Sequence, residues 1–168
     1  SMGLDNTGPV EISGGAEFNK DSLFDVPLAF DIDMKFENGL PMKVANSSKL
    51  THGQGVCWYG ENGWIHINRE GFSASNEDFL KEEIPENGVH FYNSPDHLRN
   101  FLDCVKSRKQ TVAPVGPANR AITAGLLGEI AFLTGETIKW DPVKEELINP
   151  SAEAKALLKR EYRKPWVF

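Results

Sequence analysis

The sequence contains few of the features that identify disulfide-rich, zinc-binding or membrane proteins. Cys57 and Cys104 are its only cysteines, and they lie far apart in no metal-binding or redox spacing. This excludes a disulfide framework of the kind found in small secreted domains. We expect both cysteines to be small buried hydrophobic residues, and a disulfide between them is the alternative. No apolar run approaches the length of a membrane span, and no signal peptide is visible.

The charge balance argues against a nucleic-acid partner. The formal net charge is −6 at pH 7, so the chain lacks the positive surface that a phosphate backbone attracts. With 40% hydrophobic and 25% charged residues over 168 positions, the composition is typical of one soluble globular domain. The opening residues, Ser1 and Met2, resemble a cloning remnant. A native leader is therefore not visible, and the location, in the cytoplasm or after export, stays open.

Motifs for nucleotide binding, metal binding and hydrolysis are also missing. The segment from His52 to Gly55 begins like a dinucleotide-binding turn, but the third glycine is absent and a strand is expected to follow instead of a helix. The four histidines stand at positions 52, 66, 90 and 97, without metal-ligand spacing, so we predict no metal site. We expect His66 on a sheet surface. Asp31 and Asp33 share one strand face, where we expect a solvated pair and a catalytic pair is the alternative.

Period-two alternation of apolar and polar residues predicts two hairpins. The strand from Ala29 to Glu37 places four apolar residues on one face, namely Phe30, Ile32, Met34 and Phe36. Asn38-Gly39 is a strong hairpin turn, and the return strand over 40–45 contains Pro41, which favours a sheet edge. A second hairpin, 56–59 with 64–68, has bulky side chains on both faces. A short strand is expected at 71–75, and a short helix with a loop at 76–88.

Two longer helices are predicted further along the chain. Ser94 and Pro95 suit the cap and the first position of a helix that runs to Lys109. Its apolar stripe consists of Leu98, Phe101, Leu102 and Val105. The helix over 117–134 is apolar almost all round, so we expect deep burial, and Gly125 and Gly128 indicate a backbone packed nearby. A strand at 137–140, a modest helix at 151–160 and an aromatic tail at 161–168 that docks on the domain are expected to follow.

The order of these elements predicts the fold class. Hairpins followed by helices favour an α+β fold with a mostly antiparallel, open-faced sheet and helices packed on one face. Residues 1–24 are rich in glycine and polar residues, with one short β-like run at 10–12, and are expected to form an extended lead-in. Residues 25–168 are expected to form a single domain.

Several blocks of sequence, in a fixed order, resemble one family. These are GVCWYGENGWIHINR (55–69), HLRNFLDCVKSRKQTVAPV (97–115), TGETIKWDPVKEE (134–146) and YRKPW (162–166). Together they resemble the C-terminal part of bacterial Gfo/Idh/MocA oxidoreductases. The resemblance implies a parent enzyme that uses NAD or NADP and acts on a sugar or polyol. It also implies that this chain is the C-terminal substrate and oligomerisation domain.

The same resemblance indicates what the chain lacks. The Gly-rich Rossmann domain, the Glu-Lys-Pro motif and the catalytic histidine of the family have no match in this sequence. Arg163-Lys164-Pro165 is not that motif and stands at the wrong end of the chain. We therefore assign no catalytic and no cofactor-binding residue, and we expect the chain alone to be inactive.

Three residues are candidates for the substrate side of the domain. Asn119 and Arg120 stand in the expected first turn of an otherwise apolar helix, where an arginine is unexpected without a partner. A salt bridge or a packed aliphatic stem is one explanation, and recognition of a hydroxyl or carboxylate is the other. His97 is the third candidate, with a local hydrogen bond in the first helical turn as the alternative.

The second hairpin supplies the candidates for an oligomer interface. They are Trp58, Tyr59, Trp64, Ile65 and Ile67, with Trp58 and Trp64 expected on one face and the other three on the opposite face. A monomer seldom exposes so large an apolar area, so we expect a homo-oligomer formed through the sheet. Coverage by a Rossmann domain or by residues 1–24 is the alternative. Because aromatic side chains also stack on sugar rings, a stand-alone carbohydrate-binding or assembly module without redox function is the alternative function.

Overall fold

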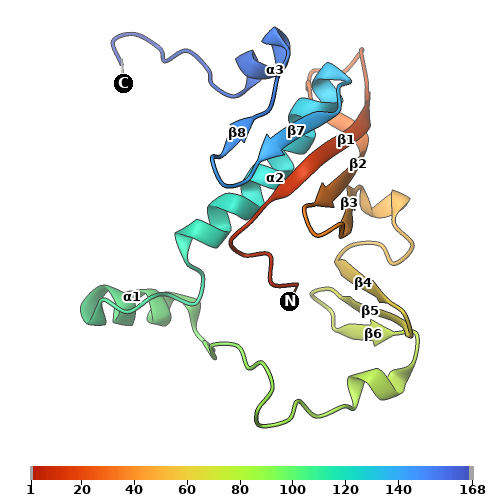
Figure 1. Cartoon of the computed structure of the whole chain (residues 1–168), viewed down its shortest axis with the longest axis vertical. Coiled ribbons are helices and arrows are strands. Elements are labelled where there is room, and N and C mark those ends of the chain that lie inside the picture. The colour runs from red at the N-terminus through yellow and green to blue at the C-terminus, as the bar shows by residue number, and fades with distance from the viewer. Residues whose placement is uncertain (1, 167–168) are drawn as a thin grey trace. The chain divides into compact units, whose positions relative to one another are not determined.

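A computed structural model describes residues 2–166, and Figure 1 shows its elements. The chain forms two compact units. The first unit combines the two ends of the chain, up to Ala45 and from Val115 onward, and the second unit is Asn46–Pro114. The single domain expected over 25–168 stays a prediction.

The first unit contains a five-stranded sheet in which neighbouring strands are antiparallel. The strand order is β3-β2-β1-β7-β8. The strands are β1 (Pro9–Phe18), β2 (Pro27–Phe36), β3 (Pro41–Ala45), β7 (Ile138–Asp141) and β8 (Glu146–Leu147). With a long helix packed against this sheet, the predicted α+β class is confirmed.

The central strand, β1, lies in the segment that the sequence suggested was an extended lead-in. It is ten residues long and pairs with both β2 and β7. Ile12 is fully buried opposite Met34 and Ile138. Glycine is depleted in strands, so the glycines of β1 weaken the pattern by which the sequence would predict this strand. A side chain at Gly14 would meet the Asp31 carbonyl, which explains why the strand contains glycine there.

The hairpin of β2 and β3 forms as predicted. The side chains of Ile32, Met34 and Phe36 are buried, whereas the charged residues between them point to the other face. The Phe36 N–H donates to the Leu40 carbonyl at 3.0 Å, and Gly39 adopts a positive φ of 84° in the turn. β3 is an edge strand, which explains why Pro41 is tolerated.

Helix α2 (Val115–Thr134) packs along β1, β2 and β7, as Figure 1 shows. Its buried face consists of Ala124, Leu127, Gly128, Ile130 and Ala131. Leu127 is almost completely buried, and burial of such a side chain contributes about 1.5–3 kcal/mol. The prediction that this helix is buried all round is wrong, because Ile122, Leu126 and Leu133 on other faces are exposed.

The C-terminal end of the first unit is partly packed. Helix α3 (Ala152–Leu157) is capped by the Ser151 hydroxyl, which accepts from the Ala154 N–H at 3.0 Å. Ala154 is fully buried and α3 contacts α2. Tyr162 and Trp166 are more than half exposed, so the expected docking of the aromatic tail is wrong for its described part. Positions 167 and 168 of that tail lie outside the described residues.

The second unit contains a three-stranded antiparallel sheet in the order β4-β5-β6. Its strands are β4 (Val56–Gly60), β5 (Gly63–Ile67) and β6 (Phe72–Ala74), close to the predicted bounds. Short 3-10 helices, η1 (Ser47–Lys49) and η2 (Glu77–Leu80), stand before and after it. The sequence predicted one sheet for the whole chain, and residues 2–166 instead form two.

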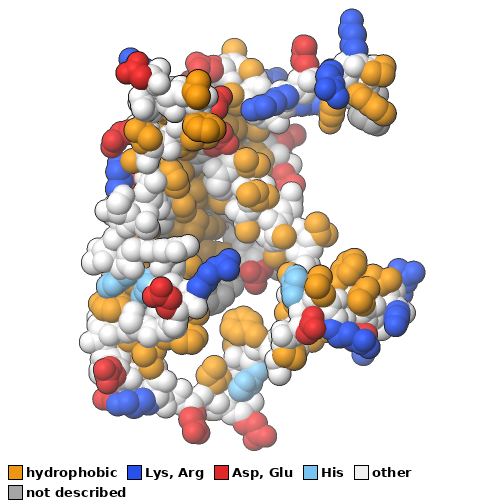
Figure 2. Space-filling model, turned by 180° about the vertical axis from the view of Figure 1, so that it is seen from behind, with side chains coloured by type: hydrophobic (Ala, Val, Ile, Leu, Met, Phe, Trp, Pro, Cys, Tyr) orange, Lys and Arg blue, Asp and Glu red, His pale blue; other side chains and the backbone are white. Residues whose placement is uncertain are grey.

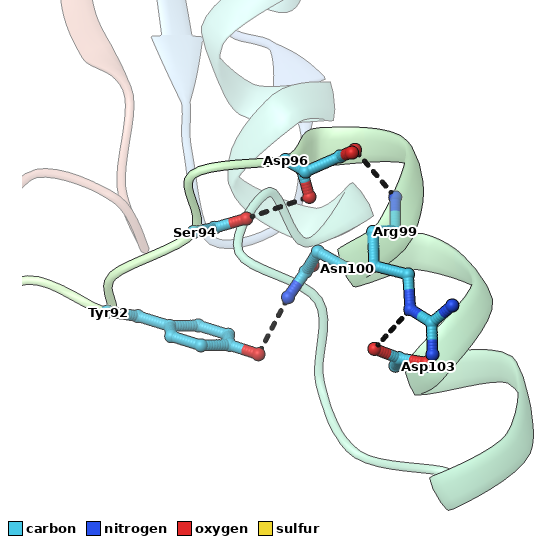
Figure 3. Close-up of polar contacts among 6 residues, drawn as sticks. All are labelled: Tyr92, Ser94, Asp96, Arg99, Asn100 and Asp103. Atoms are coloured by element: carbon cyan, nitrogen blue, oxygen red, sulfur yellow. Dashed lines mark hydrogen bonds and ion pairs between the residues drawn. The ribbon is translucent and has the colours of Figure 1, made fainter.

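Helix α1 (His97–Ser107) also belongs to the second unit. The predicted cap at Ser94 is wrong: the Asp96 carboxylate accepts from the Arg99 N–H at 2.8 Å, while the Ser94 hydroxyl donates to the Asp96 carbonyl (Figure 3). The helix ends before Lys109, because Arg108 adopts a left-handed φ of 58°.

The predicted apolar stripe of α1 is exposed. Leu98, Phe101, Leu102 and Val105 each keep at least 45% of their surface accessible. Figure 2 shows hydrophobic side chains gathered on this helix beside Lys and Arg side chains. The expectation that this helix and the one over 117–134 cover the same sheet face is not supported, since α1 and the five-stranded sheet belong to different units.

Candidate functional site

Arg120 lies in the second turn of α2 and lines a small cavity of the first unit. The other lining residues come from the entry to β1, from α2, from β7 and from the turn after β7: Thr7, Gly8, Pro9, Thr123, Trp140, Pro142 and Glu145. The space inside that a water-sized group can occupy is ≈ 10 Å³. This is about the room that one buried water needs, so the cavity accepts a single oxygen-sized group.

The Arg120 guanidinium is only partly satisfied. Its Nη2 lies 3.9 Å from Glu145 Oε1, so the ion pair considered from the sequence is present but long. Its Nε is buried and has no hydrogen-bond partner among the described residues. Leaving a buried donor unpaired costs about 1–3 kcal/mol. An unpaired donor beside a water-sized cavity indicates a place where a polar atom binds.

Glu145 is held beside Arg120 by the turn between β7 and β8. Its N–H donates to the Asp141 carbonyl at 2.8 Å, and the residue adopts a left-handed φ of 57°. The Asp141 carboxylate accepts from the N–H groups of Lys144 and Val143, both at 3.0 Å. These two backbone donors lower the pKa of Asp141 below its ordinary value, and the Lys144 N–H has the larger effect. The ionised Asp141 therefore fixes the turn that positions Glu145.

The structure does not bring the other substrate-side candidates to this cavity. Asn119 is exposed, and its carbonyl accepts from the Thr123 hydroxyl at 2.8 Å. His97 is the exposed first residue of α1, in the second unit. Asn119 and His97 therefore stay predictions without a shared site. Sequence reasoning missed Glu145 and Trp140, because they stand 25 and 20 positions from Arg120 and no local pattern joins them to it.

Near His97, the polar side chains of α1 bind the flanks of the helix. Asn100 Nδ2 donates to the Tyr92 hydroxyl at 2.7 Å, and Asn100 Oδ1 accepts from the Val112 N–H at 3.0 Å. Arg99 Nε donates to Asp103 at 3.0 Å, as Figure 3 shows. The Asn100 contacts join α1 to the segments before and after it, and the Arg99–Asp103 contact joins successive turns of the helix. All three therefore stabilise α1 locally.

The register of the three-stranded sheet corrects the predicted faces of the interface candidates. Trp58 pairs with Ile65, and Tyr59 pairs with Trp64. Directly opposed residues of an antiparallel pair share a face. Trp58, Ile65 and Ile67 therefore lie on one face and Tyr59 and Trp64 on the other, so the predicted grouping of Trp58 with Trp64 is wrong. The hairpin does have bulk on both faces, as expected.

The face with Tyr59 and Trp64 also contains two histidines. His66 is buried, so its predicted place on a sheet surface is wrong. Its Nε2 lies 3.2 Å from the Gln54 carbonyl and donates to it, which leaves Nδ1 to accept from the Ser73 hydroxyl at 3.5 Å. The His52 ring lies 4.0 Å from the Trp64 ring and 5.5 Å from the His66 ring, centroid to centroid. Sequence analysis did not place His52 beside Trp64 and His66, because it stands 12 and 14 positions before them.

The remaining polar candidates have structural partners. Asp31 and Asp33 both bind Lys43 Nζ, at 2.5 and 2.8 Å. These hydrogen bonds raise the pKa of Lys43, and the one with Asp31 has the larger effect. Both cysteines are free: Cys104 is buried, as expected, and Cys57 is half-buried. A hydrogen bond with Cys57 raises the pKa of the exposed Tyr59 hydroxyl.

Within residues 2–166, no group of three His, Cys, Asp or Glu side chains could hold a metal ion.

No helix among the described residues is long and apolar enough to cross a membrane.

Comparison with known proteins gives the family of the chain. No curated protein matches the sequence. The model of one family, described as the oxidoreductase family, C-terminal alpha/beta domain, matches residues 2–168. The chain therefore belongs to the C-terminal alpha/beta domain of the Gfo/Idh/MocA oxidoreductase family.

Proposed function

We propose that this chain is the substrate-side and oligomerisation domain of an NAD(P)-dependent oxidoreductase that acts on a sugar or polyol. The observation that supports this most strongly is the family match over residues 2–168. The nicotinamide supplies the hydride chemistry when it is bound by the parent enzyme. The residues of this chain bind and orient the substrate and contribute no catalytic group.

The nicotinamide cofactor does not fit the residues of this chain. Dinucleotides bind where a Gly-rich turn leads from a strand into a helix, whose N-terminal N–H groups receive the pyrophosphate. The segment from His52 to Gly55 instead leads into β4. Gly53 and Gly55 both have positive φ, but no helix N-terminus follows them. We therefore derive no step of the reaction through a cofactor bound to this chain.

The cavity beside Arg120 is the substrate-side contribution that the geometry supports best. Arg120 offers hydrogen-bond donors, Glu145 offers acceptors, and the buried Trp140 forms an apolar wall. Such a combination of a few convergent polar groups with apolar lining is typical of small-molecule sites. In the parent enzyme, this cavity would fix one polar group of the substrate.

The sheets supply two different surfaces for association. The open face of the five-stranded sheet is polar, with Glu11 opposite both Lys35 and Lys139, and Asp33 opposite Lys43. The three-stranded sheet is apolar on the face that contains Trp58, Ile65 and Ile67, and Val56 and Phe72 there are more than half exposed. We propose that this apolar face forms the oligomer contact, because burial of apolar surface is more favourable than burial of the polar face of the five-stranded sheet.

The experiment that tests the proposed function begins with the open reading frame that encodes the chain. Reading the frame upstream is expected to show a Gly-rich βαβ unit, and the purified full-length product is expected to reduce NAD or NADP with a member of a sugar and polyol panel. The isolated 168-residue chain is expected to bind neither cofactor. An upstream frame without that unit, or saturable NAD binding by the isolated chain at micromolar concentration, would contradict the proposal.

A second function, carbohydrate binding without redox chemistry, is favoured by one feature of the three-stranded sheet. Tyr59 is 68% exposed on the face where the His52 ring packs against Trp64. Exposed aromatic rings of this kind stack on sugars. Calorimetry of the isolated chain with a monosaccharide panel separates the two functions: micromolar binding that is lost in Tyr59→Ala would favour the binding module.

A further inference from the structure

We propose that the cavity between Arg120 and Glu145 is a binding site for a single hydroxyl group, and that it selects neutral polyhydroxylated ligands over their acidic and amino counterparts. This inference rests on the proposed function, whose substrate class it narrows. It assigns the selection to two named side chains.

The size of the cavity limits what can enter. A space of ≈ 10 Å³ for water-sized groups holds one oxygen atom, so a single hydroxyl or one oxygen of a larger group can enter, and the charges of the site decide between them. Pro9 and Trp140 are buried and form part of its wall. Hydrogen bonds formed against such an apolar wall are stronger than those in water.

The two charged side chains demand a group that both donates and accepts. Arginine has only donors, and the Arg120 Nε is buried without a hydrogen-bond partner in the described part of the chain. An ionised glutamate has only acceptors, and Glu145 Oε1 lies 3.9 Å from Arg120 Nη2, too far for a good hydrogen bond between them. A hydroxyl can accept from Arg120 and donate to Glu145 at once. A carboxylate can only accept, and an ammonium can only donate.

The charges of the site reinforce this selection. Arg120 and Glu145 cancel one another, so a neutral group enters without uncompensated charge. An anionic group that approaches Arg120 also approaches the Glu145 carboxylate, and a cationic group that approaches Glu145 meets the guanidinium. Like charges at such short range disfavour binding.

The left-handed backbone of Glu145, held by the turn after β7, positions its carboxylate beside Arg120. The left-handed region is unfavourable for a non-glycine residue, and glycine or asparagine adopts it more easily. Glu145 nevertheless occupies this position with φ of 57°. Here the strain holds a carboxylate at the mouth of the cavity opposite Arg120.

The test follows the Arg120 Nε–H resonance of the isolated chain by ¹⁵N–¹H NMR, assigned by its loss in Arg120→Lys. Glucose, glucuronate and glucosamine are titrated at about pH 6, where the acid is ionised and the amine protonated. We expect a saturable shift with glucose and a response at least roughly tenfold weaker with the two charged probes, since each brings a charge that the Arg120–Glu145 pair leaves uncompensated.

Two variants test the assignment of the selection to this pair. Glu145→Gln removes the negative charge, so glucuronate binding is expected to improve by roughly tenfold while glucose binding weakens. Glu146→Gln, one residue along, is the matched control and should leave both responses unchanged. Because Arg120 is partly buried and its replacement could disturb folding, Glu145→Gln at an exposed position is the decisive variant.

Three outcomes would overturn the inference: no saturable shift of the Arg120 resonance with any probe, equal affinity for the three probes, or the same selectivity in Glu145→Gln as in the wild type. None of these measures hydride transfer. Failure of the proposed function would instead appear as an inactive full-length product, so the two failures are distinguishable.

Discussion

Gly128 of α2 lies directly against Ile32 of β2: a Cβ at position 128 would lie 2.6 Å from Ile32 Cδ1 and 3.1 Å from Ile32 Cγ2. The helix approaches the sheet closely because glycine leaves room for a side chain that is itself buried. Gly125, three residues earlier, has nothing within 4 Å of its added Cβ. Alanine substitutions at these two positions of the same helix are therefore expected to change the stability of the chain in opposite directions.

Gly128→Ala is expected to destabilise the chain by about 1 kcal/mol. Overpacking costs about 1–3 kcal/mol, and the gain in helix propensity offsets about 1 kcal/mol of it. Gly125→Ala, the matched control, is expected to stabilise it by about 0.5–1 kcal/mol. Urea denaturation followed by circular dichroism measures both free energies of unfolding. Equal effects at the two positions would show that the helix does not pack as closely as described.

The cap of α1 is tested by a pair of alanine substitutions. Asp96→Ala removes the carboxylate that accepts from the Arg99 N–H and is expected to cost about 0.5–2 kcal/mol. Ser94→Ala, the control, removes a hydroxyl that makes only a long bond to the Asp96 carbonyl, and its effect is expected within about 0.5 kcal/mol. Amide hydrogen exchange in 97–107 reports the local stability. A larger loss of protection in Ser94→Ala would restore Ser94 as the cap.

The turn that holds Glu145 should depend on pH through Asp141. Its folded-state pKa lies below the ordinary value of 3.8, so its ionised form contributes stability above pH 3.8, which is lost as the pH falls through the folded-state pKa. We expect Asp141→Ala to unfold at a lower temperature than the wild type at pH 7. The difference should shrink as the pH falls below 3.8.

The check is a series of thermal melts between neutral and acidic pH, with Glu146→Gln as the control. Glu146 lies opposite Asp141 in the β7–β8 pair but is exposed and receives no such backbone donors among the described contacts. A difference between Asp141→Ala and wild type that stays constant down to strongly acidic pH would contradict the role of the ionised carboxylate.

The corrected register makes the interface prediction specific to one face. Ile65→Glu places a charge on the face with Trp58 and Ile67, and we expect it to abolish self-association. Tyr59→Glu alters the opposite face and should leave association unchanged. Light scattering over a wide range of concentration is the measurement. A wild-type chain that stays at 18.7 kDa throughout would reject association through this sheet.

Most of the elements could be predicted because their causes are local. The alternation of Phe30, Ile32 and Met34 predicts β2, and Asn38-Gly39 predicts its turn, since side-chain periodicity and turn conformation depend on a few neighbouring residues. Gly135 ends α2 as expected, with a φ of 69°. The family resemblance also came from local blocks of sequence, and the family match over residues 2–168 confirms it.

Only the tertiary structure decided which of these elements meet. β1 is the central strand although its glycines weaken the strand pattern, because its partners β2 and β7 supply the burial of Ile12. The faces of the second hairpin followed from its register, which pairs Trp58 with Ile65 across the turn. Arg120 was visible in the sequence as a charge on an apolar helix. Its partner Glu145 was not, because the turn that brings the two together is formed by contacts between β7, β8 and α2 that no sequence spacing encodes.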